Sequence, residues 1–117
     1  MDIKIIRKKI SFQELKAIAA LNYGDLVKGV VDLRQEIIAL GGELHADAEA
    51  VLLDHDSHQR DLWGFNIYPD KSRNEWLEFT SFINIRPSVG NRSIEIKDPG
   101  IQNQIRRIVD SLMESHG

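Results

Sequence analysis

The spacing of hydrophobic residues changes twice along this chain, from a helical period to a strand-like alternation and back. Residues 3–6 hold three isoleucines, a composition typical of a short strand. Ser11 can cap a first helix, because Glu14 stands three residues on as its capping-box partner. Apolar residues spaced by three and four over 25–40 predict a second helix, which the double glycine at 41–42 ends.

The middle of the chain alternates between apolar and polar residues, as a half-buried strand does. In 62–68 and 76–86 the odd-numbered residues are mostly apolar, and the polar linker 69–75 is typical of a hairpin turn. The sequence therefore predicts an antiparallel hairpin in which Tyr68 pairs with Trp76. The opposed pairs in this register are Asn66 with Glu78, Gly64 with Thr80, and Trp63 with Ser81.

The segments on either side of this hairpin are less regular. Residues 43–53 fit a helix by propensity and a strand by alternation, and we favour a strand over 50–53 that joins the hairpin. Residues 94–96 predict a short additional strand. Asp98 can cap a last helix with Pro99 in its first position, and the apolar stripe of this helix predicts that it packs on the sheet.

These elements predict an α+β fold in one domain that spans residues 1–117. A chain of 117 residues has the usual size of a single domain. The sheet is expected to be an antiparallel meander of three to five strands, with two N-terminal helices and the C-terminal helix packed on one face. The other face then carries the even-numbered residues of the hairpin, among them Tyr68, Trp76, Phe82 and Arg86, open to solvent.

Composition narrows the class of partner. The 15 Lys and Arg residues against 18 Asp and Glu give a net charge of −3, which argues against a dedicated nucleic-acid binder. The chain has no cysteine, which excludes disulfides and thiolate chemistry. No apolar run reaches the roughly 18 residues of a transmembrane helix, and the first residues lack the apolar core of a signal peptide. We therefore expect a cytoplasmic protein without a membrane partner.

The loop 86–93 holds the leading candidate for a binding site. Its arginines, serines and asparagine surround a glycine that lets backbone N–H groups approach a ligand, as in sites for phosphate or carboxylate. The alternative is that Arg86 and Arg92 pair with nearby carboxylates such as Glu78 or Glu95. The predicted ligand-binding residues are Arg86, Ser88, Asn91 and Arg92, with Asn66 and Asn84 nearby.

Two histidine-containing segments are further candidates. In an extended segment, Glu43, His45 and Asp47 would project from one face, where a carboxylate could orient the imidazole for proton transfer or metal binding. The structural alternative is that His45 fixes the chain by hydrogen bonding and Asp47 caps a turn. His55 and His58 stand among carboxylates and could ligate a metal, but their spacing matches no established ligand pattern. We therefore predict no metal site and no cofactor.

Three motifs place polar residues among apolar ones: GGELHAD at 41–47, LWGFN at 62–66 (LWGxN), and INIRPSVGNRS at 83–93 (INIRPSxGNRS). With these motifs the chain resembles a family of small uncharacterised prokaryotic proteins classed as a domain of unknown function. The resemblance runs over nearly the whole sequence. It implies a bacterial or archaeal cytoplasmic protein, and it brings no activity or ligand with it.

Three functions stay open on the sequence alone. The leading hypothesis is a small binding module for an anionic small molecule or a phosphate-bearing partner, centred on the loop 86–93. One alternative is a hydrolase-type enzyme that uses His45 with Asp47 or Glu43, which requires that they share a cleft with the arginines. Another is a homodimeric protein-interaction subunit that associates through the aromatic residues of the even-numbered face.

Overall fold

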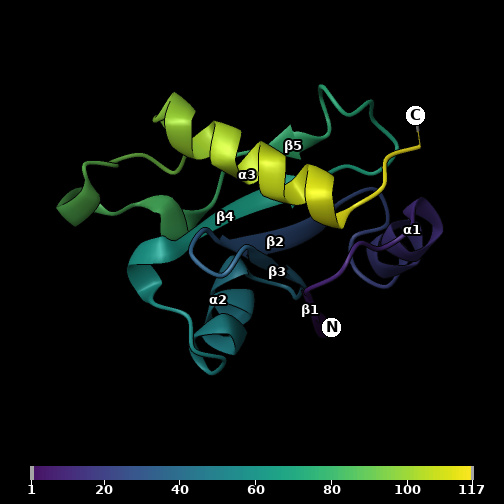
Figure 1. Ribbon diagram of the computed structural model, residues 1–117, viewed down its shortest axis with the longest axis horizontal. Helices are drawn as coiled ribbons and strands as arrows, with labels where there is room; N and C mark the ends of the chain where they lie inside the picture. The colour runs from purple at the N-terminus through teal and green to yellow at the C-terminus, as the bar shows by residue number, and fades with distance from the viewer. Residues whose placement is uncertain (1, 117) are drawn as a thin grey trace.

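A five-stranded antiparallel sheet forms the centre of the protein, in the spatial order β1-β3-β2-β4-β5 (Figure 1). The structure is a computed structural model that describes residues 2–116. The strands are β1 (Ile3–Ile6), β2 (Val27–Asp32), β3 (Ile37–Gly41), β4 (Leu62–Ile67) and β5 (Leu77–Glu78). The helices are α1 (Phe12–Ala20), α2 (His45–Leu53) and α3 (Pro99–Leu112), with 3-10 turns η1 (Gln59–Asp61), η2 (Phe82–Asn84) and η3 (Pro87–Val89). The predicted α+β class with an antiparallel sheet is confirmed.

Residues 25–40 form the hairpin β2–β3, so the predicted second helix is wrong. Both strands lie inside the sheet and are buried on both faces, which gives a near-continuous apolar run instead of a clear alternation. The turn is closed by Asp32, whose carboxylate accepts hydrogen bonds from the backbone N–H groups of Arg34 (2.8 Å) and Gln35 (3.0 Å). Glu36 takes a positive φ of 56°, which lets the chain reverse.

Residues 45–53 form the helix α2, so the predicted strand over 50–53 is also wrong. The alanine-rich composition follows helix propensity here, and the Asp47 carboxylate accepts from the backbone N–H of Leu44 (3.3 Å) at the start of the helix. Because α2 buries Ala48 and Leu52 against the sheet face that α3 does not cover, helices lie on both faces, which corrects the expectation of one covered face.

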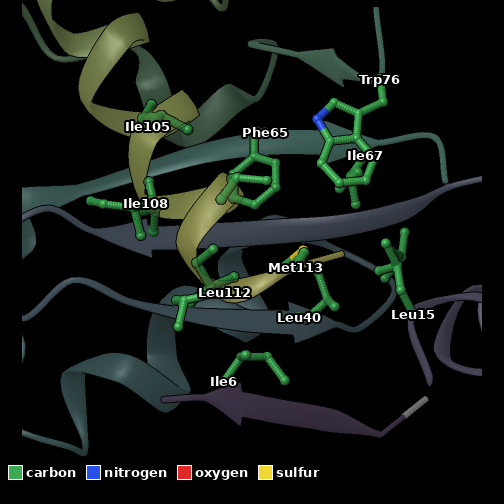
Figure 2. Packing of buried hydrophobic residues seen from close by; sticks show 14 of the residues in the cluster. Ile6, Leu15, Leu40, Phe65, Ile67, Trp76, Ile105, Ile108, Leu112 and Met113 are labelled. Carbon is green, nitrogen blue, oxygen red and sulfur yellow. The ribbon is translucent and has the colours of Figure 1, made fainter. Parts of the chain in front are cut away.

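The last helix, α3, covers the larger core of the protein. Its start is confirmed as predicted, because the Asp98 carboxylate accepts from the backbone N–H of Gly100 (2.7 Å) ahead of a first turn with Pro99. Figure 2 shows the buried side chains of α3 facing the apolar residues of the sheet. Those labelled there include Ile105, Ile108 and Leu112 from α3, with Leu40, Phe65 and Ile67 from the strands.

The first helix and the end of the chain lie together at one edge of this core (Figure 1). The predicted start of α1 is confirmed, since the Ser11 hydroxyl accepts from the backbone N–H of Glu14 (3.1 Å). Ile10 donates its backbone N–H to the carbonyl of Leu112 (2.9 Å), which ties the entry of α1 to the end of α3. Within residues 2–116, no helix is both long and apolar enough to cross a membrane.

The hairpin β4–β5 begins in the predicted register and then departs from it. Tyr68 donates its backbone N–H to the Trp76 carbonyl (2.8 Å), and Asn66 lies opposite Glu78, as predicted. However, β5 ends at Glu78, so the predicted pairs farther along do not form. Trp76, which was expected on the open face, is only 1% exposed and packs beside Ile67 (Figure 2). Thr80 instead forms an isolated bridge with Glu95, the only pairing that the segment 94–96 makes in the described chain.

Candidate functional site

The segment after β5 is fastened to the sheet by the side chain of Asn84. Its Oδ1 accepts from the backbone N–H of Gly64 (2.8 Å), and its Nδ2 donates to the Gly64 carbonyl (3.0 Å) and to the Ile94 carbonyl (3.2 Å). The side-chain amide of Asn84 therefore hydrogen-bonds both the N–H and the carbonyl of Gly64. This contact lies on the part of the β4 edge that β5 does not reach. All three bonds are internal, and Asn84 is fully buried. The ligand-binding role of Asn84 stays a prediction, and the internal bonds of its side-chain amide do not support that role.

The loop 86–93 is held in shape by Asn91. The Asn91 Nδ2 donates to the carbonyls of Asn84 (2.8 Å), Ser93 (2.9 Å) and Glu95 (3.0 Å), and its Oδ1 accepts from the backbone N–H of Lys97 (3.1 Å). Backbone hydrogen bonds between Arg86 and Asn91 close the base of the loop. Like Asn84, Asn91 uses its side chain to position the loop, and its ligand-binding role also stays a prediction.

Arg86 is the charged residue at the centre of the site. Its Nη2 lies 3.1 Å from Glu49 Oε2 on α2, and the two side chains are only 10% and 13% exposed. The guanidinium also lies over the ring of Trp63, 5.3 Å from the ring centroid. Burial lowers the pKa of Arg86, and the charge and hydrogen bond of Glu49 oppose this. Its Nη1 is buried and has no hydrogen-bond partner within residues 2–116, so the guanidinium is only half satisfied.

A cavity of about 440 Å³ lies beside this ion pair, between α2, η1 and the loop that follows η2. Arg60 is exposed in its wall, so the cavity has two cationic side chains and one carboxylate, Glu49. Ser88 also lines the cavity, whereas Arg92 is exposed elsewhere on the loop and does not line it. The apolar part of the wall comes from Phe82, Ile83, Ile85, Pro87 and Val89.

His45 stands at the first position of α2, and its contacts are those of the structural alternative, in which His45 hydrogen-bonds the chain and Asp47 caps a turn. The imidazole is buried, and its Nε2 donates to the carbonyl of Phe65 (2.8 Å). Burial lowers the pKa of His45, while the hydrogen bond to the Phe65 carbonyl raises it. Asp47 caps the helix, and Glu43 is exposed, with its carbonyl accepting from the hydroxyl of Tyr23 (2.7 Å). No hydrogen bond joins the imidazole to either carboxylate in the described structure.

His45 and Glu49 are one helical turn apart on α2, so His45 lies on the same side of the sheet as Arg86. His45 lines a second cavity of about 170 Å³. Phe82 lines both cavities. The second cavity also takes in Lys28 of β2 and Asn66 of β4, which are paired in the sheet.

Three of these residues, Lys28, Glu49 and Arg60, were not expected from the sequence. Lys28 and Glu49 fall in segments whose secondary structure was predicted wrongly. In the sequence, Arg60 is recognisable only as a charged residue between two predicted strands. Its place in the cavity depends on the tertiary fold, which local spacing does not report.

The segment 54–58 brings no metal site together. Within residues 2–116, no three side chains of His, Asp or Glu converge as ligands. The Nδ1 of His55 contacts the Val51 carbonyl (2.7 Å), and Ser57 donates to the buried carboxylate of Asp32 (2.6 Å). The polar residues of this loop therefore attach it to α2 and to the β2–β3 turn.

Fold and site together define a small α+β protein in which Arg86, with one nitrogen unpaired within residues 2–116, lies beside an open cavity. One fold can host many different functions, so the fold alone does not identify the function of this protein. The chain belongs to the DUF5674 family, described as proteins of unknown function, whose profile matches residues 4–112. The predicted resemblance to a family of uncharacterised proteins is confirmed at this level. Searches of curated proteins and of solved structures return no match to the chain.

Proposed function

We propose that the protein binds an anionic small molecule in the cavity beside Arg86. The observation that carries this proposal is the buried Nη1 of Arg86, which has no partner within residues 2–116 although Arg86 lines the cavity. Buried polar groups are rarely left unpaired, so an unpaired guanidinium nitrogen at a cavity wall favours a ligand acceptor. Phosphate and carboxylate oxygens fit the fork of donors that arginine presents.

The wall of the cavity supports an organic anion over a bare ion. Arg60 adds a second, exposed cation, and Ser88 adds a hydroxyl. Phe82 is 83% exposed, and Ile85 and Val89 are also exposed, so an apolar or planar part of the ligand would cover surface that now faces water. Glu49 competes with the ligand for the guanidinium, which predicts modest affinity and selectivity against weak anions.

The same exposed apolar residues favour a second candidate, a homodimer interface. Of the aromatic residues expected on the even-numbered face, Trp76 is buried, Tyr68 is half-buried and Phe82 is exposed, so association would centre on Phe82. Sedimentation of the purified protein tests this: a strict monomer at high concentration contradicts it. The hydrolase alternative gains no support, because no carboxylate hydrogen-bonds to His45 among residues 2–116. Cytoplasmic location and prokaryotic origin stay predictions.

The anion site is tested by thermal shift with inorganic phosphate, pyrophosphate and ribose 5-phosphate. A ligand that binds the native state raises the melting temperature by mass action. Arg60→Gln should weaken this rise, and Glu49→Gln, which removes the competing charge while keeping an acceptor for Arg86, should strengthen it. Arg92→Gln is the matched control, because Arg92 lies outside the cavity.

Two results would overturn the proposal. The first is that none of the three anions stabilises the wild-type protein. The second is that Arg92→Gln reduces the stabilisation as much as Arg60→Gln does, because this would show a general effect of charge.

A further inference from the structure

The charged side chains around the Arg86 cavity add up to one positive charge. Arg86 and Arg60 are the two cations, and Glu49 is the carboxylate among the residues that line the cavity. Of the two terminal nitrogens of Arg86, Nη2 is taken by Glu49 (3.1 Å), and Nη1 has no hydrogen-bond partner within residues 2–116. A ligand with one negative charge therefore neutralises the cavity, whereas a second charge on the ligand would have no cation of its own.

The number of charges on a ligand also sets the cost of removing it from water. The attraction between ligand and cavity grows in proportion to the charge of the ligand, whereas the desolvation free energy of an ion grows with the square of its charge. A doubly charged phosphate ester would gain about twice the attraction of a carboxylate and lose about four times the hydration free energy. The charge balance of the cavity therefore favours a monoanion.

The backbone of η3 and of the residues that follow it is occupied with its own hydrogen bonds. Val89, Gly90 and Asn91 donate their backbone N–H groups to carbonyls of the same loop, each at 3.1 Å. Pro87 has no N–H group, so along this stretch the N–H of Ser88 is the one without such a bond. Backbone sites for phosphate use several converging N–H groups, and one N–H does not make such a site.

The remaining wall of the cavity is apolar and open to solvent. It consists of Phe82, Ile83, Ile85, Pro87 and Val89. Phe82 is the most exposed of them, and its ring can contact another ring face to face or edge to face. The volume of about 440 Å³ lies in the usual range of small-molecule sites. The cavity therefore has room for an aromatic ring beside the anionic group.

We infer that the ligand is a monocarboxylate that carries an aromatic ring, with its carboxylate at Arg86 and Arg60 and its ring against Phe82. This inference rests on the proposed anion site and names the class of its ligand. A carboxylate accepts from two converging donors, which the two guanidinium groups supply. Phosphates bind at the same place but more weakly, because they carry more charge than the cavity balances.

The test measures the affinities of four compounds at pH 8 by NMR titration of the full chain. Phenylacetate has both the ring and one charge. Acetate lacks the ring, phenylacetamide lacks the charge, and phenyl phosphate carries two charges because its second pKa is about 6. Phenylacetate should bind roughly tenfold more tightly than acetate, since burying about 60 Å² of apolar surface is worth that factor. It should also bind several-fold more tightly than phenyl phosphate, and at least tenfold more tightly than phenylacetamide.

The variant Phe82→Ala tests where the ring binds. This side chain is exposed, so its loss should not disturb folding, and the ratio of phenylacetate to acetate affinity should fall towards one. Leu21→Ala is the matched control, because Leu21 is also a highly exposed apolar residue, 74% exposed, and does not line the cavity. It should leave the ratio unchanged.

The variant Glu49→Gln tests the charge balance. It raises the net charge of the cavity side chains to two, so phenyl phosphate should gain more affinity than phenylacetate does. Glu75→Gln is the matched control, because Glu75 is an exposed carboxylate of the linker 69–75 and does not line the cavity. It should leave the relative affinities of the two compounds unchanged.

The outcomes separate the two proposals. If inorganic phosphate stabilises the protein through Arg60 but phenylacetate binds no more tightly than acetate or phenyl phosphate, the carboxylate inference is wrong and the anion site stands. The same holds if Phe82→Ala keeps the affinity ratio, or if Glu49→Gln gives no gain to phenyl phosphate over phenylacetate. If phenylacetamide binds as tightly as phenylacetate, the cavity does not recognise charge, and the anion site and the inference that rests on it are both wrong.

Discussion

Replacing Asn84 with alanine should cost about 3 kcal/mol of unfolding free energy. The substitution removes the two hydrogen bonds to the Gly64 backbone and the one to the Ile94 carbonyl. Each intramolecular hydrogen bond contributes about 1 kcal/mol net. Asn84 is fully buried, so water cannot easily replace the lost amide and the true cost lies at or above this value. The melting temperature should fall by roughly 10 °C.

Urea unfolding followed by tryptophan fluorescence measures this cost, because both Trp63 and Trp76 are buried and change environment on unfolding. The matched control is Asn103→Ala, which removes the same side chain from the exposed face of α3. It should change the unfolding free energy by less than about 0.5 kcal/mol. If Asn84→Ala behaves like this control, the amide does not fasten the segment after β5, and our account of the site's construction is wrong.

Two further predictions concern the sheet itself. Gly29→Ala should cost roughly 2 kcal/mol or more of unfolding free energy, because an added Cβ would lie 2.5 Å from the buried ring of Phe65. Gly90→Ala should cost about 1 kcal/mol, from its positive φ alone. Equal costs in urea unfolding would contradict the steric explanation. Burial would raise the pKa of Asp32, but hydrogen bonds from Ser57, Gln35 and Arg34 prevail and lower it. Because the folded-state pKa lies below the unfolded value of about 3.9, this carboxylate stabilises the protein above that value and the stabilisation is lost as the pH falls through the folded pKa. The difference in unfolding free energy between wild type and Asp32→Asn should therefore be largest near pH 7 and shrink on acidification, and a constant difference from pH 7 to pH 3 would refute this.

Local signals predicted the elements at the two ends of the chain. The caps Ser11 and Asp98 act over three residues, so the starts of α1 and α3 could be located without knowledge of the rest of the fold. The alternation in 62–67 also sufficed, because β4 places its odd-numbered residues in the core under α3. In each case the physical cause lies within one element.

The hairpin β2–β3 and the helix α2 could not be predicted in this way. Strands that are buried on both faces lose the alternation that identifies a strand, and the apolar residues of 25–40 then match a helical spacing equally well. Only the short turn at Asp32 distinguishes a hairpin from a helix in this segment. In the sequence, an aspartate at this position is equally compatible with the exposed surface of a helix. The alanines of 45–53 leave helix and strand in balance until the sheet is present to pack against.

The candidate site, like the fold, could be predicted only in part from local signals in the sequence. The sequence located Arg86 and offered a carboxylate partner as the alternative to a ligand, and the structure supplies a carboxylate from elsewhere, Glu49, 37 residues away. The two carboxylates that the sequence suggested as partners bind other residues: Glu78 accepts from Asn66, and Glu95 pairs with Lys97. A polar residue in a loop motif can contact a ligand or hold the loop, and its neighbours in sequence do not decide between these roles.

The early end of β5 is the feature that connects the fold to the two cavities. A strand that continued past Glu78 would bond the edge of β4 through its backbone, and residues up to Arg86 would alternate regularly between the two faces. Instead, the side chain of Asn84 occupies the edge at Gly64, where Ser81 packs so closely that a Cβ on Gly64 would lie 2.5 Å from it. The backbone is thereby free to form η2 and η3, which bring Phe82 and Arg86 over α2. The protein uses buried amides in place of a strand to build an irregular surface, and this surface carries Arg86, whose buried Nη1 has no partner within residues 2–116.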